Sequence, residues 1–374
     1  MENSVSGVLK RTNKQNFVLR SFEKSLRASP QDILVSPGLS SKNGLTEGAV
    51  VCGQAKRQKG KTHLLTVESV GGLPPEKFKK RKHYAELTAI DPFQRFDLGV
   101  DKEISMRTID LIAPIGKGTR SLIVSPPKAG KTVLLEKIVR AVRSGSPESR
   151  IIVLLVDERP EEVTSFRRST EGADILASTS DHSADEHAEL AEMVLQHVQV
   201  ELECGRDLVL VIDSLTRMGR AFNNRLRNRS RQKPTMSGGL EAGVLEIPRR
   251  LFGLARKVEN GGSVTIVATC LVDTGSRMDQ LIFEEFKGTG NSEIILDRTL
   301  AEARIFPAIN IPASGTRKEA KLYSEKENYG LKTLRKVLSS YNTRDATLSL
   351  LKLMERYPSN AAFLDSMAAG SPSR

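Results

Sequence analysis

The chain has 374 residues, of which 39% are hydrophobic and 27% charged, and its formal net charge is +12. This length suits two or three domains with a substantial core, and no apolar run approaches the roughly 18 residues of a membrane helix, which excludes a spanning segment. Three widely separated cysteines exclude a disulfide framework, and the first ten residues lack the shape of a signal peptide, so we expect a cytoplasmic protein.

Residues 7–70 contain short apolar groups separated by turn-rich stretches such as 36–44. The predicted strands are 8–9, 17–19, 33–35, 49–52 and 64–67. Such closely spaced short strands predict a small all-β barrel, which we place at residues 1–72. Gly and Pro residues followed by a run of cations then indicate a basic connector, which we place at 73–104.

The positive charge is concentrated in this first part of the chain. Residues 1–82 hold 16 Lys and Arg against 6 Asp and Glu, whereas the remaining 292 residues hold 41 against 39. This asymmetry favours an anionic partner, most simply nucleic acid. The alternative is a basic segment that only keeps the chain in solution.

From about residue 105 the pattern changes to buried strands alternating with helices. The predicted strands are 121–124, 150–156, 208–212 and 263–270, and the predicted helices are 130–143, 184–203, 215–226 and 245–258. This alternation is typical of a parallel α/β sheet, and the tail at 319–357 is mostly helical in pattern. We assign residues 105–374 to this second domain.

The segment 121–132 leads an apolar strand into a loop, after which Gly130, Lys131 and Thr132 open a helix. This order predicts a phosphate-binding loop, because the free N–H groups at a helix start bind phosphate oxygens. Lys131 is expected to reach the β- and γ-phosphates, and the Thr132 hydroxyl to ligate Mg²⁺.

Two carboxylates follow predicted strands. Asp213 is a candidate second anchor for Mg²⁺, although it could instead cap the helix that follows. Glu158 is a candidate for orienting and deprotonating the attacking water. The alternative is that the acids between 157 and 162 merely favour the N-terminus of a helix after Pro160.

Several arginines carry weaker predictions. Arg304 and Arg317 could supply a cation to a neighbouring subunit's nucleotide or form surface ion pairs, and Phe306 could stack on a base or belong to the core. Two loops, 223–239 and 274–277, could line a pore and hold RNA phosphates, or could be ordinary surface loops. The cations of the first loop are Arg225, Arg227, Arg229, Arg231 and Lys233.

These segments together resemble the Rho family of bacterial transcription termination factors. The resemblance rests on residues 114–120, 125–132, 155–163, 213–217, 273–278, 284–291 and 314–319, which stand in the family's order. It implies an α/β RecA-like P-loop NTPase domain with a parallel sheet, preceded by a small all-β OB/cold-shock-like barrel. It also implies a homohexameric ring that uses ATP and Mg²⁺, pulls single-stranded RNA through its centre and dislodges RNA polymerase.

The resemblance also implies roles for individual residues. Glu158 would be the catalytic carboxylate, Asp213 would act on Mg²⁺, and Arg317 would be a finger from the neighbouring subunit, assisted by Arg304. Phe306 would stack on adenine, and Thr274, Gly275 and Arg277 would form a pore-side RNA site. The remaining nucleotide contacts would come from Lys128, Ala129, Gly130, Lys131, Thr132, Val133 and Arg159, and from the turn Gly116, Lys117, Gly118, Thr119, Arg120 and Ser121.

The barrel departs from the family pattern. The family has two aromatic residues in a Gly-Phe-Gly-Phe run where this chain has Gln15-Asn16-Phe17-Val18, and Leu34 stands where Tyr is usual. Stacking on an aromatic side chain is worth about 1–3 kcal/mol per base. We therefore expect RNA binding that depends mainly on phosphates, with steep salt dependence and weak pyrimidine selectivity. A Rho-like regulatory ring with weak or no termination activity remains an alternative, as does a related ring ATPase such as a rotary-motor subunit or DNA recombinase.

Overall fold

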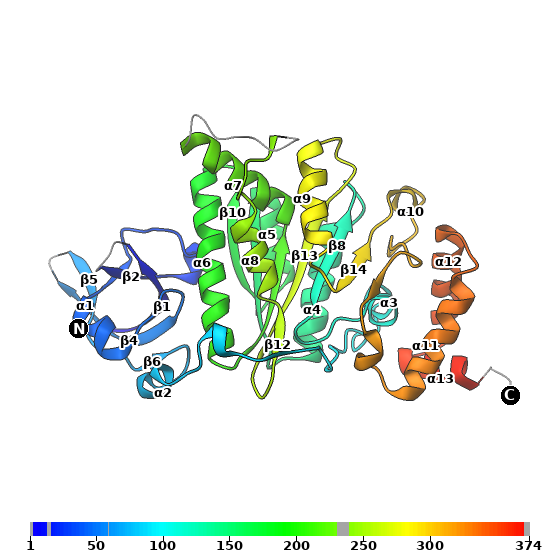
Figure 1. Cartoon of the computed structure of the whole chain (residues 1–374), viewed down its shortest axis with the longest axis horizontal. Coiled ribbons are helices and arrows are strands. Elements are labelled where there is room, and N and C mark those ends of the chain that lie inside the picture. Colours follow the sequence, from blue (N-terminus) through cyan, green and yellow to red (C-terminus); the bar gives the residue numbers. More distant parts are fainter. Residues whose placement is uncertain (1–2, 13–15, 59, 230–238, 370–374) are drawn as a thin grey trace.

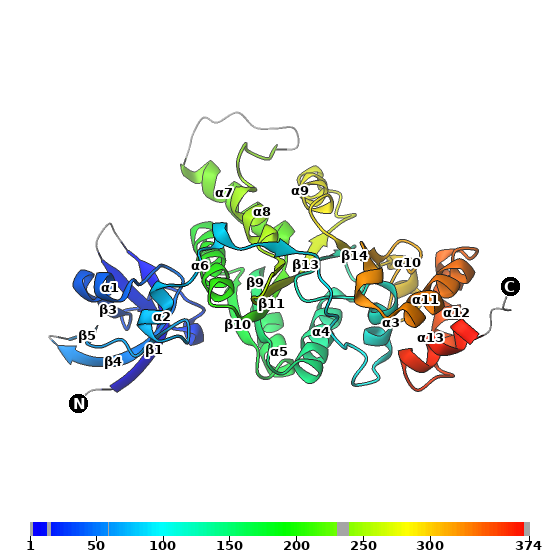
Figure 2. The ribbon, with the colours of Figure 1, turned by 60° about the horizontal axis from the view of Figure 1, so that its bottom comes forward.

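The computed structural model describes residues 3–12, 16–58, 60–229 and 239–369. The chain is elongated, with a β-barrel at one end, a large sheet between two helical layers in the middle, and three C-terminal helices at the other end (Figure 1; Figure 2). No helix in these ranges is long and apolar enough to cross a membrane.

The barrel closes through the strand order β1-β2-β3-β5-β4-β1, and β6 extends it by pairing with β4. Its strands are β1 (Asn3–Arg11), β2 (Phe17–Arg20), β3 (Ile33–Val35), β4 (Val50–Gln58), β5 (Lys61–Leu64) and β6 (Ser69–Val70). Leu9, Leu19 and Val51 belong to the core inside it. The predicted barrel is confirmed, but the expected turn at 36–44 contains helix α1 (Pro37–Asn43), because the Ser36 hydroxyl caps its first turn by accepting from the N–H of Leu39.

The barrel lies against the edge of the large sheet. A short 3₁₀ helix, η1 (Phe22–Lys24), ends at Ser25, whose hydroxyl accepts the N–H of Ala177 at 3.0 Å. Ala177 belongs to the edge strand β10 (Asp174–Thr179). Val8 and Leu26 of the barrel are buried in the same hydrophobic cluster as residues of the sheet, so the two parts share a core.

The stretch after the barrel forms α2 (Pro75–Lys79), η2 (Tyr84–Glu86) and β7 (Ala89–Ile90). β7 pairs with β12 (Arg256–Val258), which in turn pairs with β13, so this stretch contributes to the large sheet. The helix predicted over 245–258 is therefore wrong at its end. It stops as α8 (Glu246–Gly253), because residues 256–258 form antiparallel strand pairs instead.

The large sheet has the order β10-β9-β11-β13-β8-β14-β15, and all neighbours are parallel except the last pair. Besides β10, its strands are β8 (Arg120–Ser125), β9 (Arg150–Glu158), β11 (Asp207–Asp213), β13 (Ser263–Leu271), β14 (Ser292–Ile295) and β15 (Gly315–Thr316). The predicted parallel α/β sheet is confirmed. Strands β10, β14 and β15 were not predicted, since they are short and carry polar residues among the apolar ones.

Side chains of each central strand alternate between two cores. On β9, Ile151, Val153 and Leu155 face one core, and the residues between them face the other. The first core is covered by α3 (Ile104–Ile112), α4 (Lys131–Gly145), α5 (Pro160–Ser169), α11 (Glu325–Leu338), α12 (Thr343–Met354) and α13 (Asn360–Ala369). The second is covered by α6 (Ala184–Glu203), α7 (Leu215–Arg229), α8 and α9 (Arg277–Lys287). Two short helices, α10 (Arg298–Glu302) and η4 (Glu319–Leu322), lie between β14 and α11 in the sequence.

Candidate active site

The predicted phosphate loop connects the carboxyl end of β8 to the start of α4. Gly130 has a φ of +89°, a backbone conformation that favours glycine, and α4 begins at the next residue with no side chain capping it. The N–H groups of its first turn are therefore available to an anion, and the helix dipole favours negative charge there. Lys128 and Val133 are exposed beside this turn.

Two carboxylates meet Lys131 of this loop, because the carboxyl ends of parallel strands lie at the same edge of a sheet. Asp213 ends β11, and both its carboxylate oxygens lie 2.5 Å from Lys131 Nζ. Glu158 ends β9, and its Oε2 lies 3.9 Å from the same nitrogen. The Thr269 hydroxyl donates to Asp213 Oδ1 at 2.8 Å. The side chains of Asp213 and Glu158 are only 1% and 3% exposed.

Ser214, and not Asp213, serves the N-terminus of α7. The Ser214 hydroxyl accepts the N–H of Arg217 at 3.1 Å, and its carbonyl accepts the N–H of Met218. The alternative interpretation of Asp213 as a helix cap is therefore not supported. Its carboxylate is turned toward Lys131 instead.

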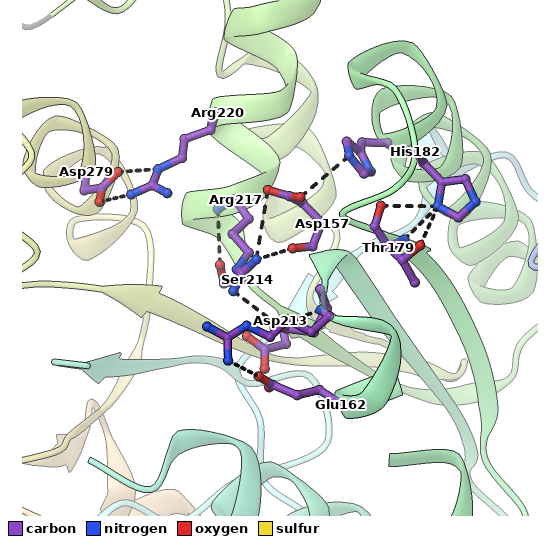
Figure 3. A network of polar contacts seen from close by, with 12 residues as sticks. Asp157, Glu162, Thr179, His182, Asp213, Ser214, Arg217, Arg220 and Asp279 are labelled. Carbon is purple, nitrogen blue, oxygen red and sulfur yellow. Dashed lines mark hydrogen bonds and ion pairs between the residues drawn. The ribbon is translucent and has the colours of Figure 1, made fainter. Parts of the chain in front are cut away.

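Arg217 of α7 is the second cation at Glu158. Its Nη2 lies 3.1 Å from Glu158 Oε1, and its Nη1 donates to the carbonyl of Asp157, whose carboxylate lies 4.0 Å away (Figure 3). Burial, and next the negative charge of Asp213, raise the pKa of Glu158, while Arg217 and Lys131 oppose that rise. Glu158 Oε2 is buried without a hydrogen-bond partner, which leaves one acceptor open in the site.

These residues fit a magnesium–nucleotide complex. Mg²⁺ prefers oxygen ligands and usually takes only one or two carboxylates, with phosphates and water completing its shell. Asp213 and Thr132 supply such oxygens beside the phosphate loop. No group of three or more His, Cys, Asp or Glu in the described ranges could hold a metal alone, so the cation would depend on the nucleotide for its other ligands.

An apolar pocket of about 290 Å³ adjoins the phosphate loop. Phe306, which is 50% exposed, lines it together with Val133 and Leu134 of α4. An aromatic ring at the wall of an open apolar pocket suits a flat base. Arg304, exposed and with a φ of +59°, lies on the same turn, two residues before Phe306.

The structure does not bring every predicted residue to this edge. The turn 116–121 precedes β8 and so lies at the opposite, amino edge of the sheet, where Lys117 pairs with Asp207 and Glu148. Arg317 follows β15 and lies at that amino edge too, with its N–H bonded to the carbonyl of Asn291. Arg304 and Arg317 are thus on opposite edges. Arg159 stays at the carboxyl edge, 67% exposed and 3.9 Å from Glu162.

The predicted RNA-contacting residues divide into three groups. Thr274 donates to Asp279 Oδ2 at 2.6 Å, and the neighbouring Gly275 and Arg277 are exposed. Arg225 is already paired with Asp185 at 3.0 Å and Glu192 at 2.6 Å on α6, whereas Arg227 is exposed. The side chain of Arg229, and all of Arg231 and Lys233, lie outside the described residues.

Helix α7 connects the carboxylates with the 274–277 loop. One turn after Arg217, Arg220 makes a two-pronged ion pair with Asp279, the residue that also accepts from Thr274 (Figure 3). Sequence reasoning gave no role to Arg217, Arg220 or Asp279. The available signal was that both arginines fall within the first two turns of a helix that starts at the site.

Comparison with known proteins supplies the family. The description "ATP synthase alpha/beta family, nucleotide-binding domain" matches residues 105–316. The chain is 45% identical over 356 residues to transcription termination factor Rho of Cereibacter sphaeroides, covering 93% of this chain and 83% of that protein. It is 46% identical over 373 residues to Rho of Aquifex aeolicus, covering 98% and 85%.

The chain belongs to the Rho family of transcription termination factors. The resemblance stated from the sequence is confirmed, and with it an ATP-hydrolysing enzyme that acts in transcription termination.

Solved structures agree on the fold. A prototypical ATPase from the type III secretion system of pathogenic bacteria has a TM-score of 0.63 at 23% identity, over 75% of this chain and 86% of that one. The assembled ATPase EscN from the enteropathogenic E. coli type III secretion system has a TM-score of 0.60 at 23% identity, over 75% and 72%. The predicted RecA-like fold is therefore confirmed.

Proposed function

We propose that this Rho-family chain is an RNA-dependent ATPase that moves along single-stranded RNA as a cytoplasmic homohexameric ring and releases the transcript from RNA polymerase. The observation that carries the proposal is the group formed by Lys131, Asp213, Glu158 and Arg217 at the end of a phosphate loop. We propose the same division of labour along the chain: a barrel for RNA at 1–72, a connector at 73–104 and the motor at 105–374.

Each site residue has a role that follows from its position. ATP phosphates on the loop attract Lys131 away from the carboxylates, and Lys128 adds a further phosphate contact. Asp213 and Thr132 then hold Mg²⁺, which neutralises charge on the phosphates. Glu158, with one carboxylate oxygen held by Arg217, keeps the other free to accept a proton from the attacking water.

The site is incomplete within one chain. Arg317 lies at the opposite edge of the sheet from Lys131, so it reaches a nucleotide only if that nucleotide is held by a neighbouring copy. A trans arginine of this kind is worth about 10³–10⁵ in rate in other phosphoryl-transfer enzymes. This placement supports hydrolysis at interfaces between subunits.

The described part of the barrel offers no exposed aromatic side chain. Phe17 is 8% exposed and packs in the barrel core, with the Arg11 guanidinium 5.1 Å from its ring centroid. By contrast, Lys56, Arg57 and Lys61 are exposed around the β4–β5 turn. These observations support capture of RNA by its phosphates more than by its bases, for which salt dependence is the expected signature.

The test is ATP hydrolysis by the full chain with no nucleic acid, poly(C), poly(U) and single-stranded DNA, each at low and high salt. We expect stimulation by both RNAs that falls steeply with salt. Stimulation by poly(C) alone, with a shallow salt slope, would contradict phosphate-led capture. Absence of any RNA effect would contradict the RNA-dependent motor and favour the regulatory ring, which the retained catalytic group does not favour.

A charge-removal series locates the RNA contact. Lys56→Gln with Arg57→Gln should raise the RNA concentration needed for half-maximal hydrolysis and reduce the salt slope by about two contacts. Glu68→Gln, which removes a carboxylate from the same barrel, serves as the matched control and should not weaken binding.

A further inference from the structure

Three arginines gather at the amino edge of the large sheet, away from the carboxylates. Arg120 is the first residue of β8, Arg256 the first residue of β12, and Arg317 directly follows β15. The turn before β8 packs against β12: a Cβ added at Gly118 would come within 2.4 Å of the backbone nitrogen of Lys257. Each arginine is close enough to lower or be felt in the pKa of Arg120, which burial also lowers.

No carboxylate in the described ranges forms an ion pair with any of the three. Arg120 Nη1 reaches only the carbonyl of Ala255, at 3.4 Å, and Arg256 lies over the ring of Tyr84 and donates to the carbonyl of Gly253. The Nε atoms of both Arg120 and Arg256 are buried without a hydrogen-bond partner. Like charges held together without a counter-ion are unfavourable unless an anion is supplied from outside.

The space for that anion is a groove of about 200 Å³. Thr119, Arg120, Asn291 and Arg317 line it, so the two arginines face one cavity. Lys318 also lines the groove, but Asp91 neutralises it at 2.9 Å. Arg120 and Arg317 are therefore the groove's uncompensated cations among the described residues.

The chain's own nucleotide cannot be the occupant. β8 separates the groove from the phosphate loop by six strand residues, or about 20 Å at the usual rise per residue. A triphosphate on a neighbouring copy can reach it, because Arg317 is proposed to act on exactly such a ligand. We propose that Arg120 joins Arg317 in contacting the phosphates of ATP bound to the phosphate loop of the adjacent subunit, so that the groove is one trans half-site.

This inference rests on the proposed function of Arg317. It assigns the predicted nucleotide contact of the 116–121 turn to the neighbour's nucleotide and not to the chain's own. Arg120 then acts as a second cation on the transferring phosphate, fixed in place by β8 and by the packing of Gly118 against β12.

The test is single-turnover ATP hydrolysis in mixed rings, which reads each interface once and does not require the ring to cycle. Arg120→Gln alone should slow hydrolysis roughly 10–100-fold while still binding a fluorescent ATP analogue. Arg120→Lys should retain most of the rate, and Arg250→Gln, which removes an exposed charge outside the groove, should be unaffected.

Mixing distinguishes the two sides of the interface. Arg120→Gln subunits mixed with Lys131→Ala subunits should regain activity, because a random equal mixture pairs an intact loop with an intact groove at about one interface in four. Arg120→Gln mixed with Arg317→Ala should regain none, since both lack the groove. Arg317→Ala mixed with Lys131→Ala should regain activity and reports on the proposed function by itself.

Each result has one meaning. Recovery with Arg317→Ala but not with Arg120→Gln, each mixed with Lys131→Ala, would overturn the inference and leave the proposed trans arginine standing. Failure of both mixtures would overturn the trans assignment of Arg317 as well. A loss of RNA affinity in Arg120→Gln with an unchanged single-turnover rate would assign the groove to RNA phosphate and also overturn the inference.

Discussion

At the scale of single residues, Arg217 controls the charge state of Glu158. Burial and Asp213 raise the pKa of Glu158, and the Arg217 guanidinium lowers it. Removing that cation in Arg217→Gln should raise this pKa further. Because a general base must be unprotonated, the acid limb of the hydrolysis rate should move to higher pH. The measurement is kcat at saturating ATP and RNA between about pH 6 and 9.

Arg217→Lys supplies the control for this shift. It keeps the positive charge near Glu158 but loses the planar fork of the guanidinium. Its acid limb should stay close to that of the unaltered chain, even if its rate is lower. An unchanged acid limb in Arg217→Gln would show that Arg217 holds the position of Glu158 without setting its charge.

At the scale of elements, α7 carries one contact to each site. Arg217 contacts Glu158, and Arg220 contacts Asp279, which accepts from Thr274 in the second loop. A shift of α7 therefore affects both. Arg220→Gln should leave hydrolysis without RNA within about twofold but reduce the stimulation by RNA roughly tenfold, measured as the ratio of the two rates.

A matched ion pair to α9 serves as the control. Arg249 of α8 pairs with Glu285 of α9 at 3.2 Å on the surface, so Arg249→Gln should preserve RNA stimulation. Arg220→Gln leaves Asp279, which is 1% exposed, without its cation. The double variant with Asp279→Asn removes this buried charge, and it should recover stability without recovering stimulation.

At the scale of the whole molecule, the contact between barrel and motor is sensitive to acid. His197 of α6 is fully buried, donates from Nδ1 to the carbonyl of Gly48 at 2.8 Å, and packs edge-on against Phe22. Burial, and next the charge of Arg150, lower its pKa from 6.5 to about 4, against the smaller opposing effect of Glu201. The unfolded chain therefore binds a proton between these values that the folded chain does not.

Stability should thus fall as pH drops from about 6.5 toward 4, by about 2 kcal/mol at pH 5 from this histidine. The measurement is urea unfolding at several pH values, followed by circular dichroism. His197→Asn should flatten this dependence, while His63→Asn, on barrel strand β5, should not. Equal acid sensitivity in His197→Asn would assign the effect to other groups.

The sequence was sufficient for the features that depend on local order. An apolar strand leading into Gly130 and Lys131 predicts the phosphate loop, and acids that end parallel strands must meet at one edge, which places Glu158 and Asp213. The helix α6 was predicted at its observed bounds because its apolar and polar residues follow a helical period.

Features that depend on the other side of a contact were not predictable. Arg225 looked available for RNA, but its partners Asp185 and Glu192 lie on a helix that precedes it by more than twenty residues. Residues 256–258 continue an apolar pattern that suits a helix, yet β7 and β13 offer them strand partners. The opposite positions of Arg304 and Arg317 follow from the direction of β14 and β15, which no local pattern reveals.

The way in which Ser25 meets β10 has a consequence for how this chain can be divided. β10 is the outermost strand of its sheet, and an uncovered outer strand presents a row of N–H and C=O groups that can recruit a strand from another molecule. The Ser25 hydroxyl occupies one of these N–H groups, and Leu26 is buried in the hydrophobic cluster that this side of the sheet shares. Cutting away the barrel would therefore expose a template for aggregation as well as removing a ligand-binding module. In this chain the first domain protects the second from self-association.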